Sequence, residues 1–485
     1  MEATRIPTGI PALDEILRGG LVASRSYLIV GETGTGKTVL SLQWLLDGVR
    51  RGERCLYITL AEPAGEVARN VAGFGWNLEG LGILDLTPAD DPTELAGDEY
   101  HVFPPSEVEQ TPTWRHIYQE LEEKKPDRLV IDSVTQLRYL SSDEYQFRKH
   151  ILALVAYLNR VGCTSFLVFE PSLLDRETSV ALAVDGVIRL RRELSAGRVI
   201  DLRSIQIEKL RGSDYLSGLH PMRIASKGIE VFPHRVSQTG DSPPGSLQLA
   251  SGIAGLDAML HGGIYSGTTT LISGPAGVGK TTLGMQFLTQ AASKGLPAVL
   301  FTFEESAASV IARSRAVGMP VDALLQSGKL RVCRLNPMQL YPDELLEWVK
   351  KMVEEEHVRA VMVDSLRGYQ LAMEQFGNMD AHLFNLVTYL NSRDVFTLLI
   401  NEVEHITGDV RFTEIGVSYL IDDGLLLRYA EIEAKIVRVI GCLKKRSGAY
   451  EPELRPYTIT PDGLHVGEPL TGLHGLLTGV PERLE

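Results

Sequence analysis

Two short glycine-rich segments contain the residues of this sequence that are best suited to chemistry. The first reads Gly-Glu-Thr-Gly-Thr-Gly-Lys-Thr over 31–38, and the second reads Gly-Pro-Ala-Gly-Val-Gly-Lys-Thr over 274–281. Both match the pattern GxxxxGK[ST], in which glycines allow a tight turn and successive backbone N–H groups surround a phosphate. Each should follow a strand and open a helix, whose N-terminus adds partial positive charge. The two segments therefore predict two binding sites for a nucleoside triphosphate.

The lysine and threonine that end each segment have distinct predicted roles. Lys37 and Lys280 would reach the β- and γ-phosphate oxygens, and the hydroxyls of Thr38 and Thr281 would bind Mg²⁺. One such match can arise as a fortuitous glycine-rich turn, but two in the same context at one spacing argue against chance. The predicted nucleotide-binding residues are Gly31, Thr33, Gly34, Thr35, Gly36, Lys37, Thr38, Gly274, Ala276, Gly277, Val278, Gly279, Lys280, Thr281 and Thr282.

One aspartate in each half ends an apolar run at the place where a metal could be held. Asp132 ends the run RLVID, and Asp364 ends the run AVMVD. Such a residue is usually a turn or cap residue, but downstream of a phosphate-binding loop it can hold the hydration shell of Mg²⁺. We therefore expect Thr38 with Asp132, and Thr281 with Asp364, to form two magnesium sites.

A pair of glutamates follows another apolar run of the second half. Glu304 and Glu305 lie in the sequence Phe-Glu-Glu-Ser, and adjacent carboxylates near a γ-phosphate suit a general base. Glu305 is also a candidate magnesium ligand. The first half has Ala61 followed by Glu62, so it keeps Glu62 as a candidate catalytic residue and lacks the other carboxylate. If the first glutamate of the pair is the base, the first site binds nucleotide but hydrolyses it weakly.

The sequence contains an internal repeat of one domain-sized unit. Residues 8–20 (TGIPALDEILRGG) match 251–263 (SGIAGLDAMLHGG) at an offset of 243, which also relates Lys37 to Lys280 (280 − 37 = 243). Asp132 and Asp364 differ by 232, so the first half carries about eleven extra residues (243 − 232). We assign them to a proline-rich, acidic loop within 88–112.

Apolar runs alternate with helical patterns in each half. Runs that are apolar throughout are typical of strands covered on both faces, and intervening helices imply right-handed crossovers in a parallel sheet. The expected strands are 26–30, 55–60, 128–132 and 164–169, then 268–273, 298–303, 360–364 and 396–400, with antiparallel additions over 186–209 and 424–444. The sequence thus predicts the α/β class, with two tandem P-loop domains that each have a mostly parallel twisted sheet flanked by helices.

Composition sets the remaining boundaries. The stretch 233–250 is rich in Pro, Gly and Ser, so it is expected to link domains 1–232 and 251–466, and 467–485 forms a tail.

The formal net charge of −14 excludes a generally basic protein that coats nucleic acid. The four cysteines form no CxxC pair, no apolar run reaches the roughly 18 residues of a membrane span, and no secretion signal is recognisable. A cytoplasmic protein with no membrane association is expected.

Taken together, these residues resemble the KaiC family of tandem RecA-like ATPases over roughly 5–466. The resemblance includes the TGIxxLDxxLxGG lead-in, both phosphate-binding segments, the Glu-Glu pair and both Asp-Ser strand ends. It implies ATP and Mg²⁺ as cofactors and a homohexamer with nucleotide between protomers. It also implies that two basic segments reach the neighbouring protomer's nucleotide, where a cation would stabilise the γ-phosphate. Their residues are Lys209, Leu210, Arg211, Lys444, Lys445 and Arg446.

The resemblance further implies autophosphorylation in the second half. The acceptor pair of the family aligns with Ser418 and Tyr419, and Thr413 aligns with another family hydroxyl. The clock proteins of the family have Ser-Thr at this pair, so the serine site is retained while tyrosine replaces the threonine. The tail does not resemble the partner-recruiting peptide of the clock proteins. A clock role is therefore not implied. The expectation is a homologue outside the oscillator, in signalling or in stress responses, with an unidentified signalling protein as a candidate partner.

Two other functions remain open at this stage. A DNA-dependent ATPase related to RecA or DnaB would share the core but needs basic loops, and the segment after Asp364 is poor in Lys and Arg. A nucleotide-gated hub would recruit a protein partner and use hydrolysis only as a timer, a reading that Ala61 favours for the first half.

Overall fold

The chain is divided into two compact units, Met1–His234 and Arg235–Glu485, in a computed structural model. The described residues are 4–87, 112–139, 141, 143–171, 178–194, 201–235, 245–338, 340–373, 379–403, 417–471, 473–474 and 482–483. The extra loop that the sequence predicts within 88–112 lies, apart from Pro112, outside these residues.

The first unit alternates strands and helices until its last four strands. Its elements are β1 (Arg5–Ile6), α1 (Pro11–Ile16), β2 (Leu21–Val22), β3 (Ser26–Val30), α2 (Lys37–Arg50), β4 (Cys55–Thr59), α3 (Ala64–Ala72), β5 (Gly82–Asp85), α4 (Pro112–Lys124), β6 (Arg128–Asp132), α5 (Val134–Tyr139), α6 (Glu144–Val161), β7 (Thr164–Phe169), α7 (Thr178–Ala183), β8 (Gly186–Leu194), β9 (Asp201–Leu210), β10 (His220–Ala225) and β11 (Gly228–Val231).

The second unit repeats this order with small differences. Its elements are β12 (Gln248–Leu249), α8 (Ala254–Met259), β13 (Ile264–Tyr265), β14 (Thr269–Gly274), α9 (Lys280–Ser293), β15 (Ala298–Thr302), α10 (Ala307–Ala316), α11 (Val321–Gln326), β16 (Leu330–Arg334), α12 (Pro342–Glu354), β17 (Ala360–Asp364), α13 (Leu366–Met373), α14 (Met379–Ser392), β18 (Phe396–Glu402), the 3₁₀ helix η1 (Val417–Leu420), β19 (Asp423–Ile432), β20 (Lys435–Lys445), β21 (Arg455–Thr460), β22 (Gly463–Val466), β23 (Leu473–His474) and β24 (Glu482–Arg483).

Both units contain a nine-stranded sheet of the same topology. The first has the order β11-β10-β9-β8-β3-β7-β6-β4-β5, and the second, from its opposite edge, β22-β21-β20-β19-β14-β18-β17-β15-β16. Six neighbouring strands are parallel, from β8 to β5 and from β19 to β16. The remaining strands are antiparallel. The predicted α/β fold of two tandem RecA-like domains is confirmed. The segments 186–209 and 424–444, expected as antiparallel additions, each begin with a strand (β8 or β19) that is parallel to the central strand, and the antiparallel part starts with the next strand.

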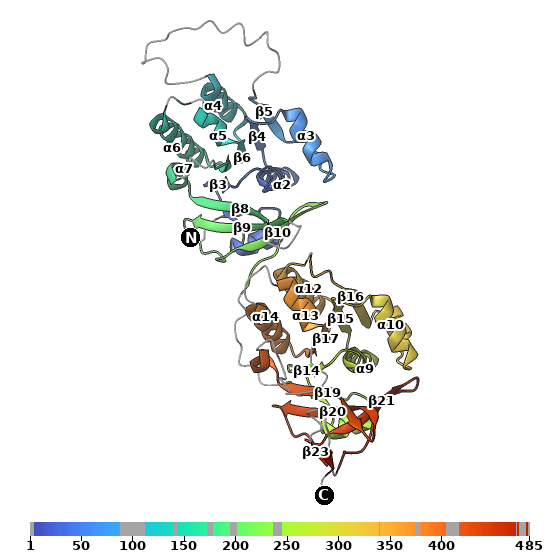
Figure 1. Ribbon diagram of the computed structural model, residues 1–485. Coiled ribbons are helices and arrows are strands. Elements are labelled where there is room, and N and C mark those ends of the chain that lie inside the picture. Colours follow the sequence, from blue (N-terminus) through green and yellow to red (C-terminus); the bar gives the residue numbers. More distant parts are fainter. Residues whose placement is uncertain are drawn as a thin grey trace. The chain divides into compact units, whose positions relative to one another are not determined.

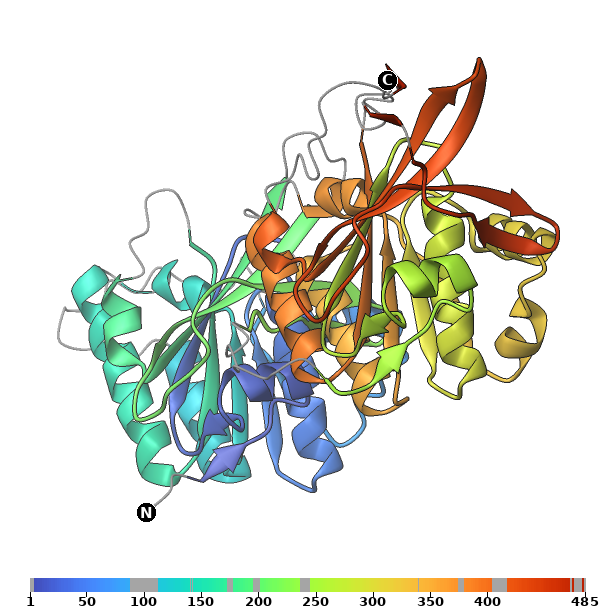
Figure 2. The ribbon, with the colours of Figure 1, turned by 90° about the horizontal axis from the view of Figure 1, so that it is seen from below.

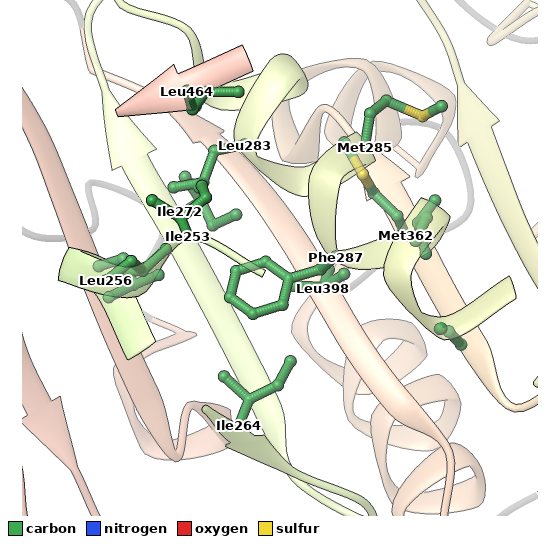
Figure 3. Packing of buried hydrophobic residues seen from close by; sticks show 14 of the residues in the cluster. Ile253, Leu256, Ile264, Ile272, Leu283, Met285, Phe287, Met362, Leu398 and Leu464 are labelled. Atoms are coloured by element: carbon green, nitrogen blue, oxygen red, sulfur yellow. The ribbon is translucent and has the colours of Figure 1, made fainter. Parts of the chain in front are cut away.

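Helices cover both faces of each sheet (Figure 1 and Figure 2). Successive residues of a strand point to opposite faces, so one continuous apolar run supplies two separate cores. On β14, Leu271 belongs to the cluster packed against α12, α13 and α14, whereas Ile272 belongs to the cluster packed against α8 and α9. Figure 3 shows part of this second cluster, in which Phe287 of α9 lies beside Leu398 of β18.

The ends of the second unit differ from the predicted boundaries. β12 lies inside the predicted linker 233–250 and pairs with β13, so backbone hydrogen bonds place its residues in the second unit. In the predicted tail, β23 and β24 pair with each other. Among the described residues, no helix has both the length and the apolar character that crossing a membrane requires.

Candidate nucleotide-binding sites

Each glycine-rich segment forms the loop between the central strand and the following helix. Gly36 and Gly279, the residues before α2 and α9, have φ of 104° and 107°, values that glycine adopts without strain. A Cβ atom on Gly36 would lie 2.9 Å from Cδ1 of Ile224, and one on Gly279 would lie 2.6 Å from Cδ1 of Ile459. The antiparallel part of each sheet therefore packs directly against its loop.

The loop residues divide into those that face the site and those that support it. Gly31, Thr35, Gly274 and Val278 are buried and line neither cavity, and the Thr35 hydroxyl donates to the Glu32 carbonyl at 2.8 Å. The predicted residues that line the first cavity, of about 310 Å³, are Thr33, Gly34, Gly36, Lys37 and Thr38. Those that line the second, of about 450 Å³, are Ala276, Gly277, Gly279, Lys280, Thr281 and Thr282.

Both loop lysines are buried at the start of their helices. The ammonium of Lys37 donates to the Glu32 carbonyl at 2.9 Å, and that of Lys280 donates to the Pro275 carbonyl at 2.8 Å. Burial lowers the pKa of both lysines, although nearby carboxylates oppose the shift. Lys280 also lies 3.6 Å from Oε2 of Glu402. A buried ammonium at the base of a glycine loop is suited to binding phosphate.

The structure brings together both predicted threonine–aspartate pairs. The hydroxyl of Thr38 donates to Oδ2 of Asp132 at 2.7 Å, and that of Thr281 donates to Oδ2 of Asp364 at 2.6 Å. Burial raises the pKa of Asp132, and it raises the pKa of Asp364 to about 6. Hydroxyl and carboxylate oxygens are the hard ligands that Mg²⁺ prefers, so both pairs fit this ion.

The glutamate pair of the second unit lies on the rim of its cavity. Glu304 accepts a hydrogen bond from the Ser365 hydroxyl at 2.6 Å, which orients its carboxylate. Glu305 forms an ion pair with Arg313 at 2.9 Å, while its Oε2 has no hydrogen-bond partner among the described residues. An unpartnered carboxylate oxygen beside Thr281 and Asp364 is consistent with an additional magnesium ligand.

The first unit has a different arrangement at the corresponding positions. Ala61 takes the place of Glu304 (304 − 61 = 243), so Ser133 has no carboxylate opposite it there. Glu62 lines the first cavity and accepts a hydrogen bond from Asn70 at 3.1 Å. The neutral Asn70 stands where the second unit has Arg313 (313 − 70 = 243). The first site therefore holds fewer charged groups than the second.

Several residues that line these cavities were not predicted from the sequence, and among them are two carboxylates and a tyrosine. Glu170 and Glu402 each follow the last apolar run of the parallel sheet at the known offset (402 − 170 = 232), a signal that could have found them. The Thr33 hydroxyl donates to Glu170. The third residue, Tyr57, lies within an apolar strand, where its type gives no sign of a polar contact.

The two basic segments end the long antiparallel hairpins and contact their own units. Lys209 donates to the Ala181 and Val184 carbonyls, both at 2.7 Å. Lys444 donates to the Ser418 carbonyl at 3.0 Å and to that of Ile421. Within the described residues, no member of either segment lines one of these two nucleotide cavities. The other contacts are Arg211 with the Leu182 carbonyl, Arg446 with the Tyr419 carbonyl and Asp422, and Lys445 with the Leu260 and Gly263 carbonyls, while Leu210 is buried.

Two of the predicted acceptors lie on the 3₁₀ helix η1. Ser418 and Tyr419 are both exposed, and the Tyr419 side chain is 51% accessible. Thr413 lies outside the described residues. Because Lys444 and Arg446 bond to carbonyls of η1, the acceptor segment and the second basic segment are in direct contact.

Comparison with known proteins identifies the class to which this fold and these sites belong. The family model described as "ATPase: KaiC" matches residues 6–236 and again 249–471. The "Circadian clock oscillator protein KaiC" of Prochlorococcus marinus subsp. pastoris is 29% identical, over 100% of this chain and 95% of that protein. The "Circadian clock protein KaiC3" of Synechocystis sp. is 27% identical, over 98% and 94%.

The chain belongs to the KaiC family, since the family model covers both units almost entirely. It is a KaiC-like ATP-binding protein with two ATPase domains in tandem. The resemblance drawn from its motifs is therefore confirmed.

Proposed function

We propose that this protein is a Mg²⁺-dependent ATPase whose second unit phosphorylates Ser418, and that it works as a homohexameric regulatory ring. One observation carries the proposal: the second site combines a buried loop lysine, a threonine–aspartate pair and an oriented glutamate around one cavity. Lys280, Asp364 and Glu304 all line that cavity. Phosphoryl transfer depends on positioning and charge stabilisation, which this set of groups supplies.

The proposed transfer uses Glu304 as the general base. The Ser418 hydroxyl of one protomer attacks the γ-phosphorus of ATP, its proton passes to the Glu304 carboxylate, and the bond to the β–γ bridging oxygen breaks. ADP leaves with the electron pair of that bond. In hydrolysis, a water molecule takes the place of the serine. The hydrogen bond from Ser365 to Glu304 at 2.6 Å keeps the carboxylate oriented.

Thr281 and Asp364 would hold Mg²⁺ in the second site, with Glu305 as a further ligand, and Thr38 and Asp132 would hold it in the first. The ion, when bound, supplies charge that neutralises the phosphate oxygens. Lys280 binds the same oxygens from the protein side. Because the Arg313–Glu305 pair shares this rim, a change at either residue should alter the position of the other.

Assembly through the nucleotide is supported by the position of the basic segments. Arg211 and Arg446 bond to carbonyls at the ends of α7 and η1, and among the described residues no basic-segment residue lines its own cavity. A further cation for the γ-phosphate, in addition to the loop lysine of the same protomer, would come from the basic segment of the neighbouring protomer, which couples hydrolysis to ring formation.

A second candidate function applies to the first unit. Because Ala61 removes the carboxylate that the second unit presents, the first unit is suited to holding ATP and recruiting a signalling partner. A pull-down of binding proteins with ATP and with ADP tests this function, since a nucleotide-gated hub retains a partner in only one of the two states.

Intact mass spectrometry after incubation with Mg-ATP, combined with native mass, tests the main proposal. We expect six chains per particle and one added phosphoryl group on Ser418, absent from Ser418→Ala and retained in Tyr419→Phe. Glu304→Gln with Glu305→Gln should keep nucleotide and lose the phosphate. Phosphorylation of Ser418 that persists in this double variant would contradict the assigned base.

A further inference from the structure

The two sites differ at a buried position that in the first unit forms part of the cavity wall. Tyr57 of β4 corresponds to Leu300 of β15 (300 − 57 = 243), and both are almost fully buried in the cluster beneath the loop helix. Leucine shows that an apolar side chain suffices for packing at this position. Tyrosine adds a hydroxyl, which is unfavourable in a core unless it is hydrogen-bonded.

The Tyr57 hydroxyl is bonded to the residue assigned to the metal. It donates to Oδ2 of Asp132 at 2.8 Å, and the Thr38 hydroxyl donates to the same oxygen at 2.7 Å. Asp364 of the second site accepts a hydrogen bond from Thr281 at 2.6 Å, and the leucine at position 300 offers no donor. The carboxylate of the first site therefore has one hydroxyl donor that the second lacks.

This extra donor lies in a site that has lost negative charge. With Ala61 in place of a glutamate, Asp132, Glu62 and Glu170 are the carboxylates that line the first cavity, whereas Asp364, Glu304, Glu305 and Glu402 line the second. A hydrogen bond to an ionised carboxylate is among the strong ones, and outer partners of this kind orient ligands and raise metal affinity.

We propose that Tyr57 is a positioning residue that fixes the Asp132 carboxylate, so that the first site retains Mg-ATP although it lacks the carboxylate at position 61. This inference rests on the proposed ATP binding at the first site and deepens it. Tyr57 touches neither nucleotide nor metal in this role; it acts through Asp132. The first site is thereby suited to holding nucleotide rather than to turning it over.

The test isolates the first site in the full chain with Lys280→Ala. Binding of a fluorescent ATP analogue is titrated with Mg²⁺, and the rate of nucleotide release is measured at saturating Mg²⁺. Tyr57→Phe removes one oxygen and keeps the ring. We expect it to raise the half-saturating Mg²⁺ concentration by about tenfold and to speed release. Tyr57→Leu, which copies the second unit, should act in the same direction.

Tyr27→Phe is the matched control. Tyr27 is a buried tyrosine of the same cluster whose hydroxyl donates to the Val22 carbonyl at 2.9 Å, so its removal costs a core hydrogen bond away from the site. It should lower the thermal midpoint and leave the Mg²⁺ requirement unchanged. An unchanged or lower Mg²⁺ requirement in Tyr57→Phe would overturn the inference. Failure of the parent Lys280→Ala chain to bind nucleotide would instead overturn ATP binding at the first site.

Discussion

The first and second sites share one scaffold and differ in the groups placed upon it. Their strand orders are the same when read from opposite edges, and their glycine loops have nearly equal backbone angles. The first site has Ala61, Asn70 and Tyr57 where the second has Glu304, Arg313 and Leu300. The comparison teaches that the parts which hold a phosphate and the parts which transfer it are separable. A repeated domain can keep the residues that bind phosphate while the residues that transfer it change.

The largest expected effect comes from the loop lysines, because they are the cations that line both sites at equivalent positions. Lys37→Ala and Lys280→Ala should each remove one of two nucleotides per chain and weaken that site at least 100-fold, since a charge-assisted contact to phosphate is lost. Equilibrium dialysis with labelled ATP measures the stoichiometry. Two nucleotides retained by either single variant would show that a lysine is misassigned.

A glutamate placed at position 61 of the first unit tests whether the missing carboxylate accounts for the difference in catalysis between the two sites. In the Lys280→Ala background, Ala61→Glu should raise ATP hydrolysis at the first site by about tenfold or more, because a positioned general base contributes at least that much. Ala61 is exposed, so the longer side chain has room. The matched control, Ala61→Gln, has the same shape without the charge. Equal rates for the two variants in a phosphate-release assay would argue against a base at this position.

The smallest expected effect concerns a buried pair found in the second unit. Asp423 and Lys445 face each other across β19 and β20, where the first unit has Gly186 and Leu210. Burial raises the pKa of Asp423 to about 7, although Lys445 opposes the shift, and Lys444 and Asp422 are the other charged groups that act on it. The folded protein thus binds a proton that the unfolded chain releases near pH 3.8. Stability should fall as pH rises from about 4 to about 7.

Asp423→Asn removes this titrating group, so the loss of unfolding free energy with rising pH should become smaller by about 1–3 kcal/mol. Urea unfolding of the full chain at pH 5 and pH 8 measures it. Asp462→Asn, a change at an exposed carboxylate of the same unit, should leave the pH dependence as it is. Asp364, whose pKa burial raises to about 6, leaves a smaller decline of its own, so only a decline as large as that of the unaltered chain would place its source elsewhere.

Much of the fold could be predicted because the strands are unbroken apolar runs and the loops have a fixed glycine pattern. The threonine–aspartate pairs were also predictable, since the carboxyl ends of neighbouring parallel strands meet at one edge of the sheet. The role of Tyr57 could not be predicted, because the sequence of a buried strand does not distinguish a tyrosine that only packs from one whose hydroxyl donates to a site residue such as Asp132. β12 was missed because two residues in a proline-rich stretch have no period of their own, and their pairing with β13 is decided by the fold.

The contact between each glycine loop and a distant hairpin has a mechanical consequence. Ile224 and Ile459 sit where any side chain on Gly36 or Gly279 would have to go, and the Tyr457 hydroxyl also bonds to the Val278 carbonyl. If a glycine loop changes position on binding or releasing phosphate, its contacts with these strands must change as well. The outer hairpins are therefore packed directly against the phosphate-binding loops, so a displacement of these strands would also displace the loops.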